Sequence, residues 1–297
     1  MSSKLIPSNP SEVMVIRRVT PNIITCSAPF SRFGLFKVGG RGTIGTPTPP
    51  STLHPPTPAT LTSPLPPQVR LRSGSLAVFA SIALTPEVHA ALTSLAGPVK
   101  YLIAPDAEHH IFMTQWASAF PTAALLGPEG LAEKRARSQE PAGTHFQHVF
   151  TAANKDAFRV DADFDADFDY EFVHSHGNKE LVFNYRPDRT LIEADLLFNL
   201  PAREQYSRAG VSATAGMLTG WFVGLMSAEG SAVWQKRFNW YVASAMDRGG
   251  FNRSVRKIER FDFDRIIPCH GDVIESGGKG VFRKVFEWHL NAARKED

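Results

Sequence analysis

The sequence predicts an α/β protein, a four-layer αββα sandwich in which two mixed sheets lie face to face and helices cover both outer sides. β-rich material fills the first part of the chain, and beyond it helices and strands alternate in each half. The length of 297 residues fits one domain, 1–297, better than three small modules.

Strand patterns dominate the N-terminal part. Residues 13–26 read as two paired strands, because two β-rich runs flank a Thr-Pro-Asn turn at 20–22. Residues 33–38 and 42–44 extend this strand material, and a strand pattern resumes over residues 71–79, around Ser73-Gly74. The sequence therefore predicts a β-meander at the start of the chain.

A Pro-rich segment, residues 46–68, interrupts the meander. It consists mainly of Pro, Thr, Ser and Leu, and it contains no Asp, Glu, Lys or Arg. Such a composition does not bury enough apolar surface to offset the entropy of ordering. We predict a disordered surface insertion, with a proline-motif docking site as the alternative.

Helices and strands alternate after the insertion. Residues 85–95 begin with Thr-Pro-Glu, an N-cap residue followed by a first-turn proline and a first-turn acid, so they predict a helix. Residues 99–104 read as a buried strand, 110–120 as a helix with one apolar side, and 123–126 as a further strand. This order predicts a βαβ unit.

An aspartate at every second position marks residues 160–173. A strand would place all five carboxylates on one face, and we predict a solvated strand there. A calcium loop is disfavoured because Ala166 and Phe172 stand where the EF-hand pattern needs Gly and Glu.

The C-terminal part completes the second half of the sandwich. A hairpin is predicted from residues 181–185 and 190–192. The remaining predicted elements are helices at 228–246, 252–260 and 280–293 and a strand at 265–268.

Composition excludes several classes of protein. The net charge of +3 is small, and no basic run is present, so nucleic acid is not an expected partner. The N-terminus lacks the apolar run of a signal peptide, and the most apolar stretch, 211–226, is too short to span a membrane. Cys26 and Cys269 are far apart in sequence, which favours two buried thiols in a reduced compartment and a cytoplasmic protein.

Four clusters of side chains that can bind metal each follow a predicted buried strand, where α/β proteins place their sites. Each cluster alone is weak evidence, because adjacent histidines are more often helix-capping or surface residues. The clusters are Asp106, Glu108, His109 and His110; His174 and His176; Glu193 and Asp195; and His270 and Asp272.

In this order the clusters resemble the ligand set of the metallo-β-lactamase superfamily. The resemblance depends on His110, His176, Asp195 in EADLLF and His270 in IIPCHGD. It extends over residues 13–275, apart from the Pro-rich insertion. The stretches APDAEHHIF, HGNKELVFNY and RIIPCHGDVIE resemble more closely an uncharacterised branch known as the DUF4336 family.

The first ligand loop departs from the superfamily pattern His-x-His-x-Asp-His. An ungapped overlay puts Pro105 and Ala107 at the two leading histidines and His109 at the aspartate. A one-residue shortening would instead let Asp106 and Glu108 replace the two imidazoles, since carboxylates also bind Zn, Mn and Fe. The sequence leaves both registers open.

The resemblance implies a divalent metal, with zinc favoured and iron or manganese as alternatives. Its predicted ligands are His110, Asp195 and His270, with His109 or Asp106 nearby and His176 at the adjacent position. The candidates around them are Asn178, Lys179, Glu180 and Cys269.

The resemblance implies a metal-dependent hydrolase that acts on a small-molecule ester, lactone or related substrate. A metal-bound hydroxide would attack the carbonyl, and Glu108 or Asp272 would orient it or accept its proton. An iron-dependent oxidoreductase is an alternative, because the carboxylates of the first loop suit iron. A scaffold with a degenerate metal site, acting as a binding module, is another.

Overall fold

The computed structural model describes most of the chain. The described residues are 9–32, 36–45, 73–95, 97–138 and 145–293. The Pro-rich segment 46–68, predicted to be a disordered insertion, lies outside them.

The larger sheet begins as an antiparallel meander and ends with parallel strands. Its order is β1-β2-β5-β6-β7-β8-β9, antiparallel from β1 to β6 and parallel from β6 to β9. The strands are β1 Val15–Thr20, β2 Ile23–Ala28, β5 Gly40–Gly45, β6 Leu76–Phe79, β7 Val99–Ile103, β8 Ala124–Pro128 and β9 His148–Phe150. The predicted meander is thus confirmed.

The smaller sheet comes from the second half of the chain. Its order is β10-β11-β12-β13, with an antiparallel hairpin between β11 and β12 and a parallel pairing of β12 with β13. The strands are β10 Phe168–Val173, β11 Glu180–Tyr185, β12 Thr190–Ile192 and β13 Arg265–Ile267. A short separate ribbon is formed by β3 Ser31–Arg32 and β4 Phe36–Lys37.

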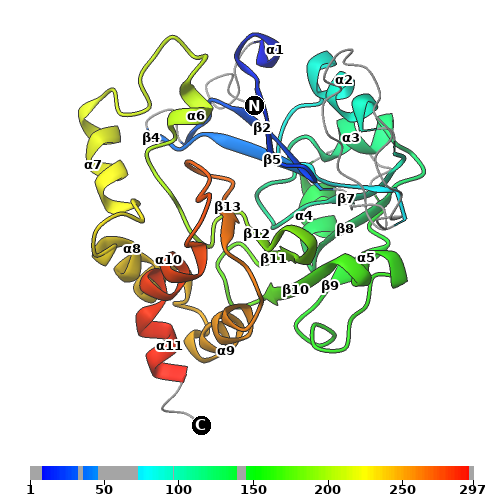
Figure 1. Cartoon of the computed structure of the whole chain (residues 1–297). Helices are drawn as coiled ribbons and strands as arrows, with labels where there is room; N and C mark the ends of the chain where they lie inside the picture. Colours follow the sequence, from blue (N-terminus) through cyan, green and yellow to red (C-terminus); the bar gives the residue numbers. More distant parts are fainter. Residues whose placement is uncertain (1–8, 33–35, 46–72, 96, 139–144, 294–297) are drawn as a thin grey trace, which may run out of the picture.

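Helices cover the outer side of each sheet (Figure 1). Side chains of the larger sheet pack with those of α2 and α3 in one core cluster, and side chains of the smaller sheet pack with those of α9, α10 and α11 in another. These helices are α2 Pro86–Ser94, α3 Met113–Ala119, α9 Arg248–Glu259, α10 Gly278–Val285 and α11 Glu287–Ala293. Leu131 of α4 Leu131–Arg137 joins the first cluster.

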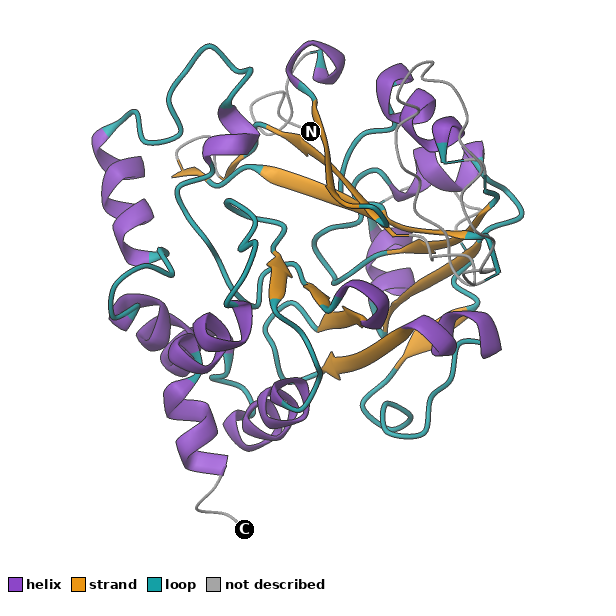
Figure 2. Ribbon diagram, in the orientation of Figure 1, coloured by secondary structure: helices purple, strands orange, loops and turns teal. Residues whose placement is uncertain are grey.

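Alternation along the strands produces a third core between the sheets. In β7, Leu102 packs toward the helices while Ile103 packs toward the smaller sheet. In β11, Val182 packs toward the other helical layer and Phe183 faces the larger sheet. Period-two alternation therefore gives each sheet two buried faces, and the predicted four-layer αββα sandwich is confirmed (Figure 2).

The N-terminal cap of α2 forms as predicted. The hydroxyl of Thr85 accepts a hydrogen bond from the backbone N of Val88 at 3.3 Å, and Pro86 occupies the first turn. Two longer predicted helices are divided instead: 228–246 becomes α8 Val233–Phe238 and the π-helical turn η2 Asn239–Ala243, and 280–293 becomes α10 and α11.

The aspartate run is not one strand, so that prediction is wrong. The helix α5 Ala162–Asp167 occupies its first half, and only β10 is extended. Asp161 caps α5 by accepting a hydrogen bond from the backbone N of Phe164 at 2.9 Å. Phe164 and Phe168, four residues apart, stack at 4.6 Å in the core between the sheets, and this apolar spacing outweighs the polar alternation.

The remaining helices lie along one side of the molecule and at the N-terminus. They are α1 Pro10–Val13, α6 Arg203–Tyr206 and α7 Met217–Leu225, with the 3₁₀ turn η1 Arg186–Asp188 between β11 and β12. Within the described residues, no helix has the length and apolarity needed to cross a bilayer. Cys26 and Cys269 are both buried and unpaired, as predicted.

Candidate metal centre

The loop after β7 is organised by a buried carboxylate. Oδ1 of Asp106 accepts hydrogen bonds from the backbone N atoms of Glu108 and His109, each at 2.7 Å. Its Oδ2 lies 2.8 Å from Nδ1 of His109. Asp106 is fully buried, so this one side chain fixes both the turn and the orientation of the His109 ring.

The segment after β12 places Asp195. The backbone N atoms of Ala194 and Asp195 donate to the two carboxylate oxygens of Glu180, at 2.8 and 3.0 Å. The side-chain amide of Asn178 donates a short hydrogen bond to Oδ2 of Asp195. The other oxygen, Oδ1, lies 3.1 Å from Nε2 of His270.

The turn after β13 places His270. Gly271 follows it with φ of +99°, and a Cβ at this position would lie 2.1 Å from the carbonyl oxygen of Asn199, so the turn requires glycine. Arg41, which is buried, donates from Nη1 to the carbonyl oxygens of Pro268 and Gly271 at 2.8 and 2.6 Å. Its guanidinium group therefore holds the turn from both ends.

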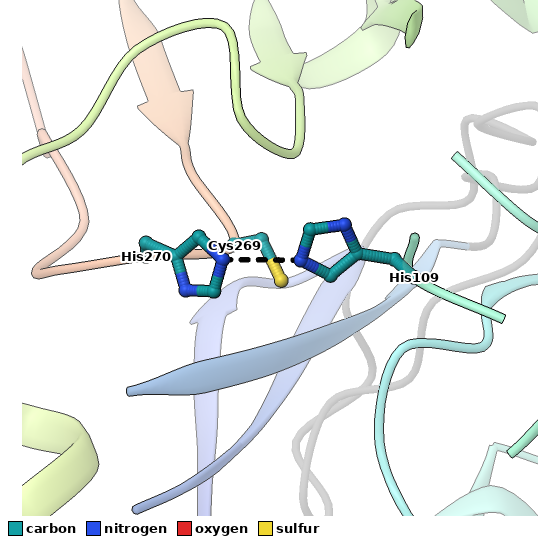
Figure 3. A group of neighbouring side chains, drawn as sticks. All are labelled: His109, Cys269 and His270. Atoms are coloured by element: carbon teal, nitrogen blue, oxygen red, sulfur yellow. Dashed lines mark hydrogen bonds between the residues drawn. The ribbon is translucent and has the colours of Figure 1, made fainter. Parts of the chain in front are cut away.

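The imidazoles of His109 and His270 face each other, with their Nε2 atoms 3.1 Å apart (Figure 3). Nδ1 of His109 faces a carboxylate oxygen of Asp106, and Nδ1 of His270 lies 2.6 Å from the carbonyl oxygen of Gly39. This hydrogen-bond network assigns the proton to Nδ1 of each ring, because each of these partners is an acceptor. Both Nε2 lone pairs then point into the same space.

The side-chain donors fall into two overlapping groups. The ligand atoms of His109, Cys269 and His270 all lie within 4.8 Å of one another, and so do those of Asp106, His109 and Asp195. His109 belongs to both groups and joins them into a single centre. We name these five residues the metal centre.

Burial and neighbouring charges act in opposite directions on the histidines of this centre. Burial alone lowers the pKa of His109, yet the charge of Asp106, with those of Cys269 and Asp195, raises it well above its usual value. Burial also opposes protonation of His270, and Cys269 and Asp195 again raise the pKa. The pocket thus stabilises positive charge between these residues.

The pKa values of two acidic groups of the metal centre, Asp195 and Cys269, are lowered. Burial raises the pKa of Asp195, but the charges of His109 and His270 outweigh it and hold that pKa well below its usual range. Burial also raises the pKa of Cys269, and the same two histidines bring it down to about 7. Behind them, burial and the charge of Asp106 raise the pKa of Glu180 well above its usual value.

Two of the predicted histidine ligands lie beside the centre. His110 is buried against α4, with Nδ1 3.1 Å from Nη1 of Arg135 and its carbonyl oxygen accepting from the same group at 2.9 Å. His176 accepts from the backbone N of Asn178 at 3.2 Å, and burial lowers its pKa. Neither histidine joins the two donor groups, whereas Asp106, His109, Asp195 and His270 do.

The two predicted proton-handling acids have different surroundings. Glu108 lines a cavity next to His109 and pairs with Nζ of Lys134 at 2.6 Å. Asp272 accepts from the backbone N of Glu204 at 2.9 Å and pairs with Arg203 at 3.5 Å, so it ties the His270 turn to α6.

Arg41 and Gly39 were not predicted as residues of the site. Both contact the His270 turn from β5 or from the residue before it, more than 200 positions earlier in the chain. Nothing in the local pattern of the meander distinguishes these two residues from ordinary strand and turn residues.

Two cavities, of about 280 and 310 Å³, flank His270, and both are also lined by Arg32. The ring of His270 stacks on Phe198 at 5.3 Å and lies 6.1 Å from Phe30. The first cavity contains His109 and Cys269, and the second contains Asp195 and His176. His270 therefore lines both cavities, and the walls of each cavity are mostly apolar.

Comparison with known proteins gives a result at the level of structure. No family model matches the sequence, and no curated protein matches it. DIM-1 metallo-β-lactamase is similar with a TM-score of 0.53 and 9% identity, covering 94% of this chain and 97% of that one. A metallo-β-lactamase from Pontibacter korlensis has a TM-score of 0.53 and 11% identity, covering 94% and 99%.

A flavodiiron core is similar as well. The metal-soaked Flv1 flavodiiron core from Synechocystis has a TM-score of 0.56 and 11% identity, covering 93% of this chain and 60% of that one. At such identities the likeness concerns the fold alone, and the resemblance to the DUF4336 family stays a prediction. The superfamily resemblance seen in the sequence is confirmed at that level: the chain has the metallo-β-lactamase fold.

Proposed function

We propose that His109, Asp195 and His270 bind a divalent metal ion, and that the chain is a metal-dependent hydrolase of a small ester, lactone or related substrate. The observation that carries the proposal is the 3.1 Å separation of the two Nε2 atoms. With both Nδ1 atoms engaged by other acceptors, the two Nε2 atoms face each other, and the space between them suits a positive charge: a shared proton in the metal-free chain, or a metal ion that takes its place.

The donor set fits such an ion. Two imidazole nitrogens and a carboxylate oxygen are ligands that zinc, iron and manganese all accept, and three protein ligands leave a position open for substrate or water. Asp106 supports His109 from behind, as carboxylates commonly support metal-binding histidines. The cavities that adjoin the centre supply access to it.

A bound divalent ion supplies a Lewis acid that polarises a carbonyl and lowers the pKa of a coordinated water. The chain then has to hold the substrate, exclude bulk water and accept a proton. Glu108 is the proposed acceptor, because its carboxylate lines the first cavity beside His109. Asp272 is engaged with Glu204 and Arg203, so we assign it the placement of the His270 turn.

The cavity walls indicate a substrate with apolar parts. Aromatic and aliphatic side chains form most of the lining, as is usual for sites that bind small organic molecules. In the first cavity these are Phe30, Ile82, Ala83, Ile111 and Phe112, and in the second Phe36, Phe198, Phe222, Met226 and Phe238. Arg32 lines both cavities.

Iron-dependent redox chemistry is the second candidate. It is favoured by the likeness to a flavodiiron core and by the two carboxylates of the centre, Asp106 and Asp195. The metal itself separates the candidates, because a hydrolase functions with zinc or manganese whereas this alternative requires iron and a coloured or paramagnetic protein.

The test begins with the metal content of protein purified without added metal, measured by inductively coupled plasma mass spectrometry. We expect about one equivalent of zinc or manganese per chain, and near-zero content in His270→Ala. His89→Asn, an exposed histidine of α2, is the matched control and should keep its metal.

Hydrolysis of a panel of chromogenic esters and lactones follows on the same samples. Chelation should abolish turnover, and re-addition of metal should restore it. Wild-type protein that contains no metal and takes none up would contradict the proposal. It would favour the alternative of a scaffold with a degenerate metal site that acts as a binding module. Wild-type protein that contains iron and hydrolyses none of the esters and lactones would favour the redox candidate.

A further inference from the structure

A thiol accompanies the two facing imidazoles. Sγ of Cys269 lies within 4.8 Å of the ligand nitrogens of both His109 and His270. Figure 3 shows the sulfur beside the line that joins the two rings. Cys269 is only 4% exposed, yet it lines the first cavity together with these histidines.

The backbone gives this thiol little freedom. Cys269 lies between Pro268 and His270 in the turn that Arg41 holds at both ends. Its backbone N donates to the carbonyl oxygen of Glu193 at 3.1 Å, and its carbonyl oxygen accepts from Gln205 at 2.8 Å. The sulfur is therefore fixed next to the imidazoles by main-chain contacts.

We propose that Cys269 is a further ligand of this metal, so that its Sγ joins Nε2 of His109, Nε2 of His270 and the carboxylate of Asp195 in a site for thiophilic divalent ions such as Zn²⁺ and Co²⁺, with substrate or water entering as a fifth ligand. The inference depends on the proposed metal centre and identifies the kind of ion that the centre selects. The ligand set implied by the sequence resemblance did not contain this cysteine.

Softness of the sulfur gives the selectivity. Thiolate ligands favour zinc, cobalt and copper(I), whereas Mn²⁺ and Mg²⁺ prefer oxygen. Sγ now donates a hydrogen bond to the carbonyl oxygen of Arg41 at 3.3 Å, which marks it as a thiol. Metal binding replaces the S–H bond with an S–metal bond and releases one proton to solvent, so the step balances without an oxidant or reductant.

Titration of the metal-free full-length chain with Co²⁺ tests the proposal. A cobalt–thiolate bond produces a charge-transfer absorption in the near ultraviolet, while visible d–d bands report any bound Co²⁺. We expect both in the wild-type protein. Cys269→Ser should lose the ultraviolet band and keep the visible bands. Its affinity for Co²⁺ should be at least about tenfold lower than that of the wild-type protein.

The other cysteine supplies the matched control. Cys26 is buried in β2, in the core between the larger sheet and its helices, and belongs to neither donor group. Cys26→Ser should therefore keep the charge-transfer band. In this variant Cys269 is the only thiol, so its alkylation by iodoacetamide should be slowed at least about tenfold by Zn²⁺ and unaffected by Mn²⁺.

The outcomes separate this inference from the function on which it depends. Visible cobalt bands without the ultraviolet band in wild-type protein would overturn the role of Cys269 and leave the metal centre standing. Absence of any cobalt uptake would overturn both. If Cys269→Ser fails to fold, the alkylation experiment on Cys26→Ser decides, since equal rates with and without Zn²⁺ also refute a sulfur ligand.

Discussion

His109 and His270 are 161 positions apart in the sequence, yet their Nε2 atoms lie 3.1 Å from each other. The fold brings them together because β7 and β13 belong to the two facing sheets and end at the same edge of the sandwich. Hydrogen-bond acceptors behind each ring then turn the two lone pairs inward. This juxtaposition has consequences for stability as well as for binding.

Metal should stabilise the folded chain. A ligand that binds only the native state at a free concentration 100 times its Kd adds about 2.7 kcal/mol to the free energy of unfolding. For a chain of 297 residues that corresponds to a rise in Tm of roughly 4 °C. Differential scanning fluorimetry with and without Zn²⁺ measures it.

His270→Asn should abolish this rise, and His89→Asn should preserve it, because the latter changes only an exposed side chain of α2. An equal rise in wild-type protein and His270→Asn would show that the stabilising ion binds elsewhere.

Asp106→Asn should weaken metal binding although it changes only one atom. Oδ1 would still accept from the backbone N atoms of Glu108 and His109, so the turn should persist. The new NH₂ group, however, would face Nδ1 of His109 and favour the tautomer that carries its proton on Nε2. We expect affinity to fall about 10–100-fold, measured by competition with a metal-chelating dye.

The turn itself serves as the control in that experiment. Thermal unfolding of metal-free Asp106→Asn should differ little from that of the metal-free wild-type chain, whereas Asp106→Ala should lose both stability and affinity. Unchanged affinity in Asp106→Asn would contradict the orienting role of the carboxylate.

Arg41 should be essential to the His270 turn. Its side chain is buried, with donors to the carbonyl oxygens of Pro268 and Gly271 and an ion pair to Glu204 at 3.3 Å. Arg41→Met leaves the carbonyl oxygens of Pro268 and Gly271 without this donor, and an unsatisfied buried acceptor costs about 1–3 kcal/mol each. Urea denaturation of the metal-free protein gives the value.

Arg189→Met is the matched control, because that arginine pairs with Asp262 while more than half exposed, and exposed pairs contribute about 0–1 kcal/mol. Similar losses in the two variants would mean that the Arg41 contacts add nothing beyond a surface ion pair.

Much of the fold could be predicted because its layers are encoded in local periodicity. The capped start of α2 and the β11–β12 hairpin follow from residue types within a few positions. The aspartate run was predicted wrongly because charge alternation and helical phenylalanine spacing coincide there, and burial of Phe164 and Phe168 favours the helix. Burial of two aromatic rings contributes more to the free energy of folding than exposure of alternate carboxylates on one strand face.

The candidate site was predictable as a set of loops but not as a set of contacts. The resemblance placed Asp195 and His270 near each other, and the structure brings them to 3.1 Å. It favoured His110 over its neighbour, whereas His109 faces the centre and His110 packs on Arg135. Adjacent residues in a turn point in different directions, and the contact between Asp106 and His109 that decides between them is invisible to a pattern of residue types.

A histidine outside the metal centre, His289, should make the stability of the chain depend on pH. His289 of α11 is fully buried, and its Nδ1 lies 2.8 Å from Oδ1 of Asn252. Burial, with the charge of Arg248, lowers the pKa of His289 from 6.5 to about 4. Above pH 6.5 the ring is neutral in both folded and unfolded chains, so its full contribution to stability is present.

As the pH falls from 6.5 toward 4, the unfolded chain binds a proton that the folded chain does not, and the free energy of unfolding should decrease by about 3 kcal/mol at most. The histidines of the metal centre add their own pH dependence, so the test is a difference. His289→Gln should flatten the dependence of urea-denaturation stability on pH between 4.5 and 6.5 relative to the wild-type chain, while His89→Gln should leave it unchanged. Parallel curves for wild-type and His289→Gln protein would show that this imidazole gains its proton as readily in the folded chain as in the unfolded one.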